Sequence, residues 1–237
     1  MRRTVASVLA ATLAPACSAR ASTPSDARIT VLAAASLTEA FEDLGRGAEV
    51  TFSFAGSQQL VAQVEAGAPV DVVATADPDA MDRLARAGLV DTPRTFATNR
   101  MTIAVGPGNP ERIQGLADLA RDGLKVILAD PAVPAGRYAR QVLEGAGVRV
   151  RPMSLELDVK AVARKVAAGE ADAGIVYATD VAAGSSVAIP AASNAVAAYP
   201  VAVVRTSANG AAAQAFLERL LGQAGRAALT AHGFSVP

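Results

Sequence analysis

The stretch from Ile29 to Leu44, ITVLAAASLTEAFEDL, constrains the fold of this chain more than any other. Three of its first four residues, Ile29, Val31 and Leu32, are apolar, and this run predicts a short buried β-strand. After three alanines, apolar residues recur at the i, i+3, i+4 and i+7 positions of one helix face, at Leu37, Ala40, Phe41 and Leu44. Ser36 and Glu39 have the spacing of a capping box, which predicts a helix that begins at Ser36. Backbone N–H groups and a serine hydroxyl at a helix start can bind an anion.

A lone capping box is usually only a cap, so the anion interpretation depends on the same arrangement recurring. It does recur, and the alternation favours an α/β fold with parallel strands and helices on both faces. The predicted strands are Ile29–Leu32, Val50–Phe54, Val70–Ala74, Met101–Val105, Lys125–Ala129, Ala173–Tyr177 and Val201–Val204. The predicted helices start at Ser36, Ser57, Asp77, Ala135 or Gly136, the N-cap Asp158, and Ala211. Residues 233–237 are expected to pack back on the body.

Residues 1–21 have the pattern of a secretory signal peptide. Arg2 and Arg3 precede an apolar run, and Ala19-Arg20-Ala21 offers a cleavage site. Cys17 is the only cysteine, so no intramolecular disulfide can form. It follows Leu13-Ala14-Pro15-Ala16, which is similar to a bacterial lipobox, and in this alternative the signal ends at Ala16 and Cys17 carries a lipid. The sequence leaves both alternatives open.

The charge balance gives no indication of a nucleic-acid partner. Cleavage after Ala21 removes Arg2, Arg3 and Arg20 from the 22 basic residues, which leaves 19 against 22 acidic residues, a net charge of −3. Any bound anion is therefore attracted by local groups. Neighbouring carboxylates are expected at solvated helix or loop positions, namely Asp77 with Asp79 and Glu170 with Asp172. No uncharged apolar stretch of 18 residues follows the signal, so we expect no integral membrane span.

Enzyme and metal-site patterns are poorly matched. A Ser–His–Asp hydrolase would have to use His232, the only histidine, and the G-x-S-x-G elbow is absent. We therefore predict a surface or helix-cap role for His232 and no enzyme activity. One histidine and one cysteine do not supply the usual zinc patterns. The candidate iron ligands Tyr138, Tyr177 and Tyr199 are scattered along the sequence.

The predicted helix starts and strand ends can converge on one site. Ligands of open α/β sheets bind beyond the carboxyl ends of the strands. There, backbone N–H groups, two serine hydroxyls and one phenol would supply neutral donors, from Ser36, Ser57, Ala135, Val159 and Tyr177. This donor set suits a fully deprotonated tetrahedral dianion. It disfavours monoprotonated phosphate, unless Asp158 accepts the proton.

Several motifs occur together in a fixed order. They are A-A-A-S-L at 33–37, F-A-G-S at 54–57, D-P-A-V-P-A-G at 130–136, D-V at 158–159, G-I-V-Y at 174–177 and Y-P-V-A-V-V at 199–204. This set resembles the periplasmic molybdate-binding proteins of bacterial ABC transporters, from about Ile29 to the C-terminus. Gly56 stands where relatives often have another serine, which predicts a looser second loop. The 130–136 loop is one residue shorter than in relatives, so Ala135 is placed less firmly than Ser36.

The resemblance implies a two-lobed periplasmic-binding-protein fold, each lobe a mainly parallel sheet flanked by helices, with the ligand in the inter-lobe cleft. Residues 27–100 plus 200–237 would form lobe 1, and residues 101–199 would form lobe 2. It also implies an oxyanion site, with molybdenum present only as the centre of the oxyanion and with no cofactor. The oxyanion would be held by the hydroxyls of Ser36, Ser57 and Tyr177 and by backbone N–H groups of Ala135 and Val159.

The function implied by the resemblance is capture of molybdate, and of tungstate, for an ABC permease. The protein would act as a monomer, either free in the periplasm or at the outer face of the cytoplasmic membrane. In the second case a lipid on Cys17 would anchor it. Binding of sulfate or phosphate, a small serine hydrolase, and a scaffold domain without a ligand remain alternatives. Molybdate and tungstate are not separated by the sequence, because the two ions differ little in size and not in charge.

Overall fold

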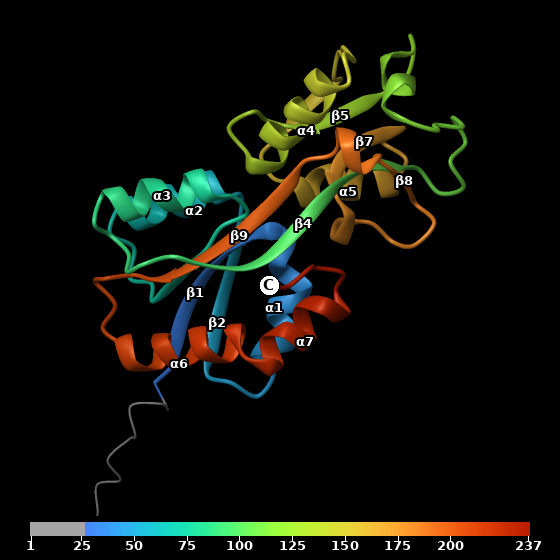
Figure 1. Ribbon diagram of the computed structural model, residues 1–237. Coiled ribbons are helices and arrows are strands. Elements are labelled where there is room, and N and C mark those ends of the chain that lie inside the picture. Colours follow the sequence, from blue (N-terminus) through green and yellow to red (C-terminus); the bar gives the residue numbers. More distant parts are fainter. Residues whose placement is uncertain (1–26) are drawn as a thin grey trace, which may run out of the picture.

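The computed structural model describes residues 27–237, so the predicted signal peptide and Cys17 lie outside the described residues. Two lobes are joined by two long strands, β4 (Arg94–Val105) and β9 (Val196–Val203), which run side by side between them (Figure 1). This confirms the two-lobed α/β fold expected from the sequence.

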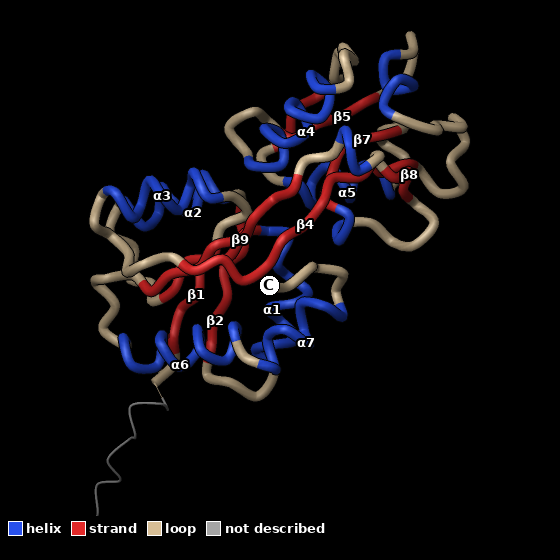
Figure 2. Tube along the Cα trace, viewed as in Figure 1, coloured by secondary structure: helices blue, strands red, loops and turns tan. Residues whose placement is uncertain are grey.

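The first lobe contains the elements from both ends of the described chain. They are β1 (Ile29–Ala34), α1 (Thr38–Gly45), β2 (Val50–Ala55), α2 (Ser57–Glu65), β3 (Val72–Ala74), α3 (Pro78–Arg86), α6 (Gly210–Leu221) and α7 (Gln223–Ala231). Its central strand β1 pairs in parallel with β2 and β3. Helices lie on both sides of these strands (Figure 2). Leu32 packs under α2 and α3, whereas Val31 and Ala33 face the core under α1, α6 and α7. Burial on both faces explains why every residue of β1 except the half-buried Thr30 is apolar.

The second lobe contains the middle of the chain. Its elements are β5 (Val126–Ala129), α4 (Pro134–Gly145), β6 (Ser154–Glu156), α5 (Val159–Ala167), β7 (Ala173–Tyr177) and β8 (Ser186–Ala188). Strand β5 pairs in parallel with β6 and β7. In both lobes the carboxyl ends of parallel strands lead into helices, and these ends meet between the lobes.

Strand β4 belongs to both sheets. Its residues 94–100 pair antiparallel with β9, and its residues 101–105 pair antiparallel with β7. The strand order is therefore β2-β1-β3-β9-β4-β7-β5-β6, with β8 also paired with β4. The pairing changes between Arg100 and Met101. The residue bounds proposed for the two lobes stay a prediction.

The sequence-based element predictions were correct for most helices and buried strands and incomplete elsewhere. Strand β4 begins at Arg94 and β9 at Val196, earlier than predicted, and β6, β8 and α7 were not predicted. The tail does pack back, because Ser235 and Thr98 exchange backbone hydrogen bonds of 2.7 and 3.0 Å. Among the described residues, no helix is both long enough and apolar enough to cross a membrane.

Candidate functional site

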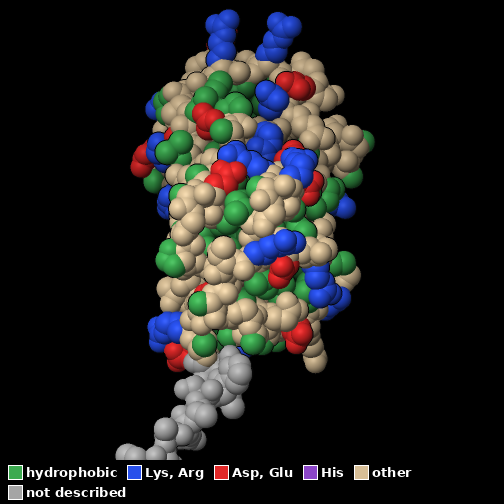
Figure 3. Space-filling view, turned by 90° about the vertical axis from the view of Figure 1, so that its left-hand side faces the viewer, with side chains coloured by type: hydrophobic (Ala, Val, Ile, Leu, Met, Phe, Trp, Pro, Cys, Tyr) green, Lys and Arg blue, Asp and Glu red, His purple; other side chains and the backbone are tan. Residues whose placement is uncertain are grey.

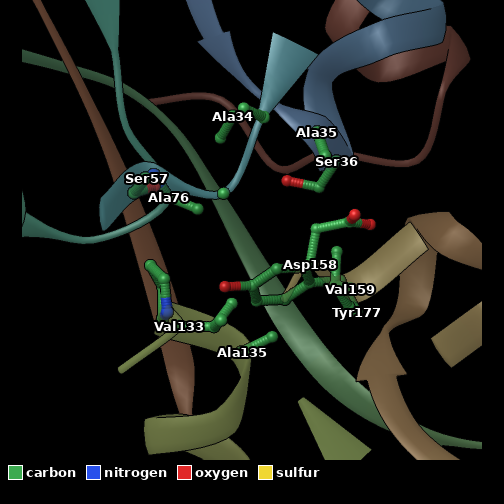
Figure 4. Close-up of a pocket in the computed structure, with 13 residues that line it drawn as sticks. Ala34, Ala35, Ser36, Ser57, Ala76, Val133, Ala135, Asp158, Val159 and Tyr177 are labelled. Atoms are coloured by element: carbon green, nitrogen blue, oxygen red, sulfur yellow. Dashed lines mark hydrogen bonds between the residues drawn. The ribbon is translucent and has the colours of Figure 1, made fainter. Parts of the chain in front are cut away.

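A small cavity lies between the lobes, and all five predicted site residues line it (Figure 4). They are Ser36 and Ser57 of the first lobe and Ala135, Val159 and Tyr177 of the second. The centre of a water molecule can occupy about 10 Å³ of the cavity. This is room for about one water molecule and is too small for a larger organic molecule.

Ser36 lies in a 3-10 turn, Ala35–Leu37, that precedes α1. Its hydroxyl makes a buried hydrogen bond of 3.0 Å with the Tyr199 hydroxyl of β9. The predicted capping box is wrong, because α1 begins at Thr38 without a side-chain cap and Glu39 instead bonds Lys160 of the second lobe. A distant phenol and a distant ammonium have replaced the local cap. The Ser36 side chain is thereby held facing the cavity (Figure 4).

Ser57 is the first residue of α2 and is almost completely buried. Its oxygen accepts a 3.0 Å hydrogen bond from the Ala76 backbone N–H, so its own hydrogen is free to be donated elsewhere. The preceding Gly56 N–H donates to the Gln59 side chain at 3.2 Å, which holds the turn. The looser loop expected from Gly56 stays a prediction.

Ala135 lies in the first turn of α4, after Pro134. The next residue, Gly136, packs against the end of β5, where a Cβ would come within 2.1 Å of the Asp130 carbonyl oxygen. Only glycine allows the helix to start so close to the strand. The shortened loop therefore still delivers Ala135 to the cavity.

Val159 is the first residue of α5. The Asp158 side chain accepts a 2.8 Å hydrogen bond from the Ala161 N–H, which confirms the predicted N-cap. Of the residues that line the cavity, only Asp158 carries a charge, and no Lys, Arg or His is among them. Donors at the cavity are thus neutral hydroxyl and amide groups, which suits an anion that only accepts hydrogen bonds.

Tyr177, at the end of β7, has the one site hydroxyl without a protein partner. Its side chain is buried, and its oxygen makes no hydrogen bond with any described residue. In Figure 4 this oxygen points into the cavity, toward the side lined by Ser57 and Ala76. Buried polar groups normally have partners, so an unpartnered hydroxyl aimed into a cavity indicates a missing ligand.

Tyr138, Tyr177 and Tyr199 are far apart in the sequence but close together in space. Their separation in the sequence is therefore no reason against an iron site. The ring centroids of Tyr177 and Tyr199 are 5.8 Å apart, and those of Tyr138 and Tyr177 are 6.4 Å apart. Burial raises the pKa of the Tyr138 hydroxyl to about 12 and raises the pKa values of Tyr177 and Tyr199. The hydroxyls therefore stay protonated and can donate. Within residues 27–237, no group of three or more His, Cys, Asp or Glu side chains could hold a metal ion.

The carboxylate pairs differ from the predicted solvated positions at one residue. Asp77 is buried, caps α3 by accepting from the Ala80 N–H at 2.8 Å, and pairs with Arg137 of the second lobe at 2.5 Å. The prediction that Asp77 is exposed to solvent was therefore wrong. A sequence signal existed, since Asp before Pro78 is a typical helix start. Its ion-pair partner comes from the other lobe, and the sequence contained no sign of it.

His232 is the C-cap residue of α7, as predicted, and its Nε2 lies 2.7 Å from Asp43 Oδ2. This contact lowers the pKa of the Asp43 carboxyl. Neither residue lines the cavity, so their geometry does not support a Ser–His–Asp triad at the candidate site.

Comparison with known proteins identifies the family. Residues 29–235 match the family described as bacterial extracellular solute-binding protein. The molybdate-binding protein ModA of Mycobacterium tuberculosis is 40% identical over 235 residues, which cover 94% of this chain and 90% of that protein. This chain belongs to the bacterial extracellular solute-binding proteins. The resemblance inferred from its motifs is confirmed.

Further relatives support the same family assignment for this solute-binding protein. ModA of Escherichia coli K12 is 32% identical, over 89% of this chain and 90% of that protein. The periplasmic molybdate-binding protein of Azotobacter vinelandii has the same fold, with a TM-score of 0.78 at 22% identity over 88% of this chain and 99% of that one. The sulfate-binding protein SubI of Mycobacterium tuberculosis also shares it, with a TM-score of 0.69 at 24% identity over 88% and 86% of the two chains. The fold alone therefore does not decide which oxyanion is bound.

Proposed function

We propose that this protein captures molybdate outside the cytoplasm and delivers it to the permease of an ABC transporter. The observation that carries the proposal is the buried Tyr177 hydroxyl, which has no protein partner and points into the inter-lobe cavity. Relatives up to 40% identical over nearly the whole chain are molybdate-binding proteins, which supports molybdate as the ligand.

The proposed binding set joins both lobes. Ser36, Ser57 and Tyr177 donate hydroxyl hydrogens, and Ala135 and Val159 donate backbone N–H groups near the starts of α4 and α5. No donor is charged, so the site favours a fully deprotonated tetrahedral dianion. Molybdenum is bound only as the centre of this dianion, and tungstate, which has the same charge and shape, is expected to bind as well.

Selectivity for molybdate over sulfate is expected to come from cavity size, since both ions accept the same hydrogen bonds. Both charge types are interspersed over the face shown in Figure 3, and the sequence has 22 basic and 22 acidic residues. Attraction of the anion therefore depends on the local donors rather than on a basic surface.

The test is a calorimetric titration of the purified protein with molybdate, repeated in excess sulfate and then with tungstate. We expect one-to-one binding of molybdate and tungstate that survives sulfate. Heat abolished by sulfate would instead assign the protein to general oxyanion or sulfate transport, and no heat with any anion would refute the proposed function.

Location and anchoring complete the proposal. The family is extracellular, which supports a periplasmic site of action. A signal sequence ending at Ala16 with a lipid on Cys17, or cleavage after Ala21, is distinguished by the mass of the mature N-terminal peptide. A monomer is expected, and light scattering of the mature protein tests it.

A further inference from the structure

Three charged side chains contact one another, and each lies close in sequence to a residue that lines the cavity. Glu39 is three residues after Ser36, Lys160 directly follows Val159, and Asp180 is three residues after Tyr177. None of the three lines the cavity. We call Glu39, Lys160 and Asp180 the charged triad.

The triad connects the two lobes. The Lys160 ammonium lies 2.8 Å from both Glu39 carboxylate oxygens, and Glu39 belongs to α1 of the first lobe. The same ammonium lies 3.2 Å from Asp180, which ends the 3-10 turn Ala178–Asp180 of the second lobe. Lys160 thus has one partner in its own lobe and one across the cleft.

The burial of the triad is asymmetric. The Asp180 side chain is fully buried and the Lys160 side chain is 15% exposed, whereas the Glu39 side chain is 53% exposed. If the lobes separate, Glu39 can be hydrated at once, while Asp180 continues to hold Lys160 in place. The intra-lobe pair therefore keeps the ammonium oriented, and the bond to Glu39 forms only when the lobes approach each other.

We propose that Lys160 is a positioning residue that ties lobe closure to anion capture, through a bond to Glu39 that exists only in the closed protein. The bond joins the segment that presents Ser36 to the segment that presents Val159, so breaking it lets the two halves of the binding set move apart. Its effect is expected on ligand release rather than on anion selectivity, because the triad does not line the cavity.

Other contacts cross the cleft, but they are less suitable for a test. Asp77 pairs with Arg137 of the second lobe while also capping α3, so its substitution would disturb the helix as well. Gln58 donates to the Leu157 carbonyl at 3.0 Å through an exposed, uncharged side chain. Glu39 has no capping role, since no side-chain cap is present on α1.

The test compares Glu39→Gln with the matched control Glu65→Gln. Glu65 pairs with Arg83 at 2.5 Å, and both residues lie in the first lobe. The ligand readout, which rests on the proposed function, is the release rate of molybdate in stopped-flow competition with excess tungstate. We expect Glu39→Gln to release molybdate on the order of 10-fold faster, Glu65→Gln to release it like wild type, and the molybdate-to-sulfate affinity ratio to stay unchanged.

A second readout needs no ligand. Spin labels on Ala62→Cys and Ala146→Cys, in a full chain with Cys17→Ser, report the distance between α2 of one lobe and the end of α4 of the other. We expect Glu39→Gln to shift the distribution toward longer distances, with a small fall in melting temperature, since, against the effect of burial, the pairing with Lys160 lowers the pKa of Glu39 and so contributes to stability at neutral pH. If wild type binds no anion, the proposed function fails, and this distance distribution alone decides the inference.

A second variant removes the triad without leaving a buried charge unpaired. Lys160→Met combined with Asp180→Asn removes both charges of the intra-lobe pair, and adding Glu39→Gln to this double variant is expected to change neither release nor distance. Equal release rates and equal distances for Glu39→Gln and Glu65→Gln would overturn the inference. An additive effect of Glu39→Gln in the double variant would also overturn it.

Discussion

The two lobes bring different kinds of donors to the cavity. In the first lobe both serines already have protein partners, since Ser36 bonds Tyr199 and Ser57 accepts from the Ala76 N–H. In the second lobe the Tyr177 hydroxyl has no partner, although it is completely buried. The first lobe therefore holds its hydroxyls in position without a ligand, and the second lobe presents a group that only a ligand can satisfy.

Binding and stability can therefore be separated within one site. A hydroxyl that bonds the protein contributes to folding as well as to binding, whereas an unpartnered buried hydroxyl destabilises the fold until the ligand arrives. Substitutions at the two kinds of hydroxyl are therefore expected to differ in their effect on the stability of the ligand-free protein.

Tyr177→Phe removes the unpartnered donor of the second lobe. We expect molybdate affinity to fall about 10- to 100-fold, since a hydrogen bond to a charged group is worth roughly 1.5–3 kcal/mol. The melting temperature of the ligand-free protein should not fall, because no protein hydrogen bond is lost. Calorimetry and thermal unfolding measure the two effects. Unchanged affinity would remove Tyr177 from the binding set.

Ser36→Ala removes a donor of the first lobe that also bonds the protein. We expect affinity to fall about 10-fold and the free energy of unfolding to fall by about 1 kcal/mol, because the Tyr199 hydroxyl loses its buried partner. The same two measurements apply. If Ser36→Ala and Tyr177→Phe lower stability equally, the proposed contrast between the lobes is wrong.

Gly56→Ser tests how closely the lobes approach each other. A Cβ at residue 56 would lie 2.7 Å from the Leu157 carbonyl oxygen of the second lobe and 2.6 Å from the Gln58 side chain. We expect a several-fold loss of molybdate affinity with little change in ligand-free stability, since the clash with Leu157 arises between lobes rather than within one. Calorimetry measures the loss, and Gly210→Ser is the matched control, because Gly210 has open space around it and its backbone is not left-handed.

Asp180 of the second lobe is expected to have a smaller effect, on how the stability of the protein depends on pH. Burial raises its pKa from 3.8 to about 6, so the folded protein holds this proton more tightly than the unfolded chain. The contribution of Asp180 to stability therefore falls as pH rises from about 4 to about 6 and stays constant above that range. Asp180→Asn should remove this slope in urea unfolding measured between pH 4 and pH 7.

For Glu39 of the first lobe, the expected pH dependence of stability has the opposite sign. Burial opposes ionisation, but the Lys160 ammonium outweighs it, and the net effect lowers the pKa of the Glu39 carboxyl below 4.5. Its contribution to stability is present above pH 4.5 and is lost as pH falls below this value. In urea unfolding, Glu39→Gln should lose the fall in the free energy of unfolding below pH 4.5, whereas Asp180→Asn should keep it. A fall that persists in Glu39→Gln would show that Glu39 does not cause it.

The N-cap signals show where sequence reasoning succeeded and where it did not. Asp158 caps α5 as predicted, because its side chain needs only the N–H three residues later. Ser36 and Glu39 carry an equally clear signal, but their partners are Tyr199, 163 residues away, and Lys160, 121 residues away. A local cap is worth about 1 kcal/mol, so buried or charged distant partners can replace it.

The local units of this protein follow from short stretches of its amino-acid sequence. Apolar runs specified the buried strands, and Gly136 allowed a helix start against a strand end. Long-range packing, by contrast, pairs β4 with both β9 and β7, brings the three tyrosine rings together, and leaves the Tyr177 hydroxyl without a protein partner. The reason is physical. Caps and turns act within about four residues, whereas strand pairing and buried contacts depend on which distant segments pack together.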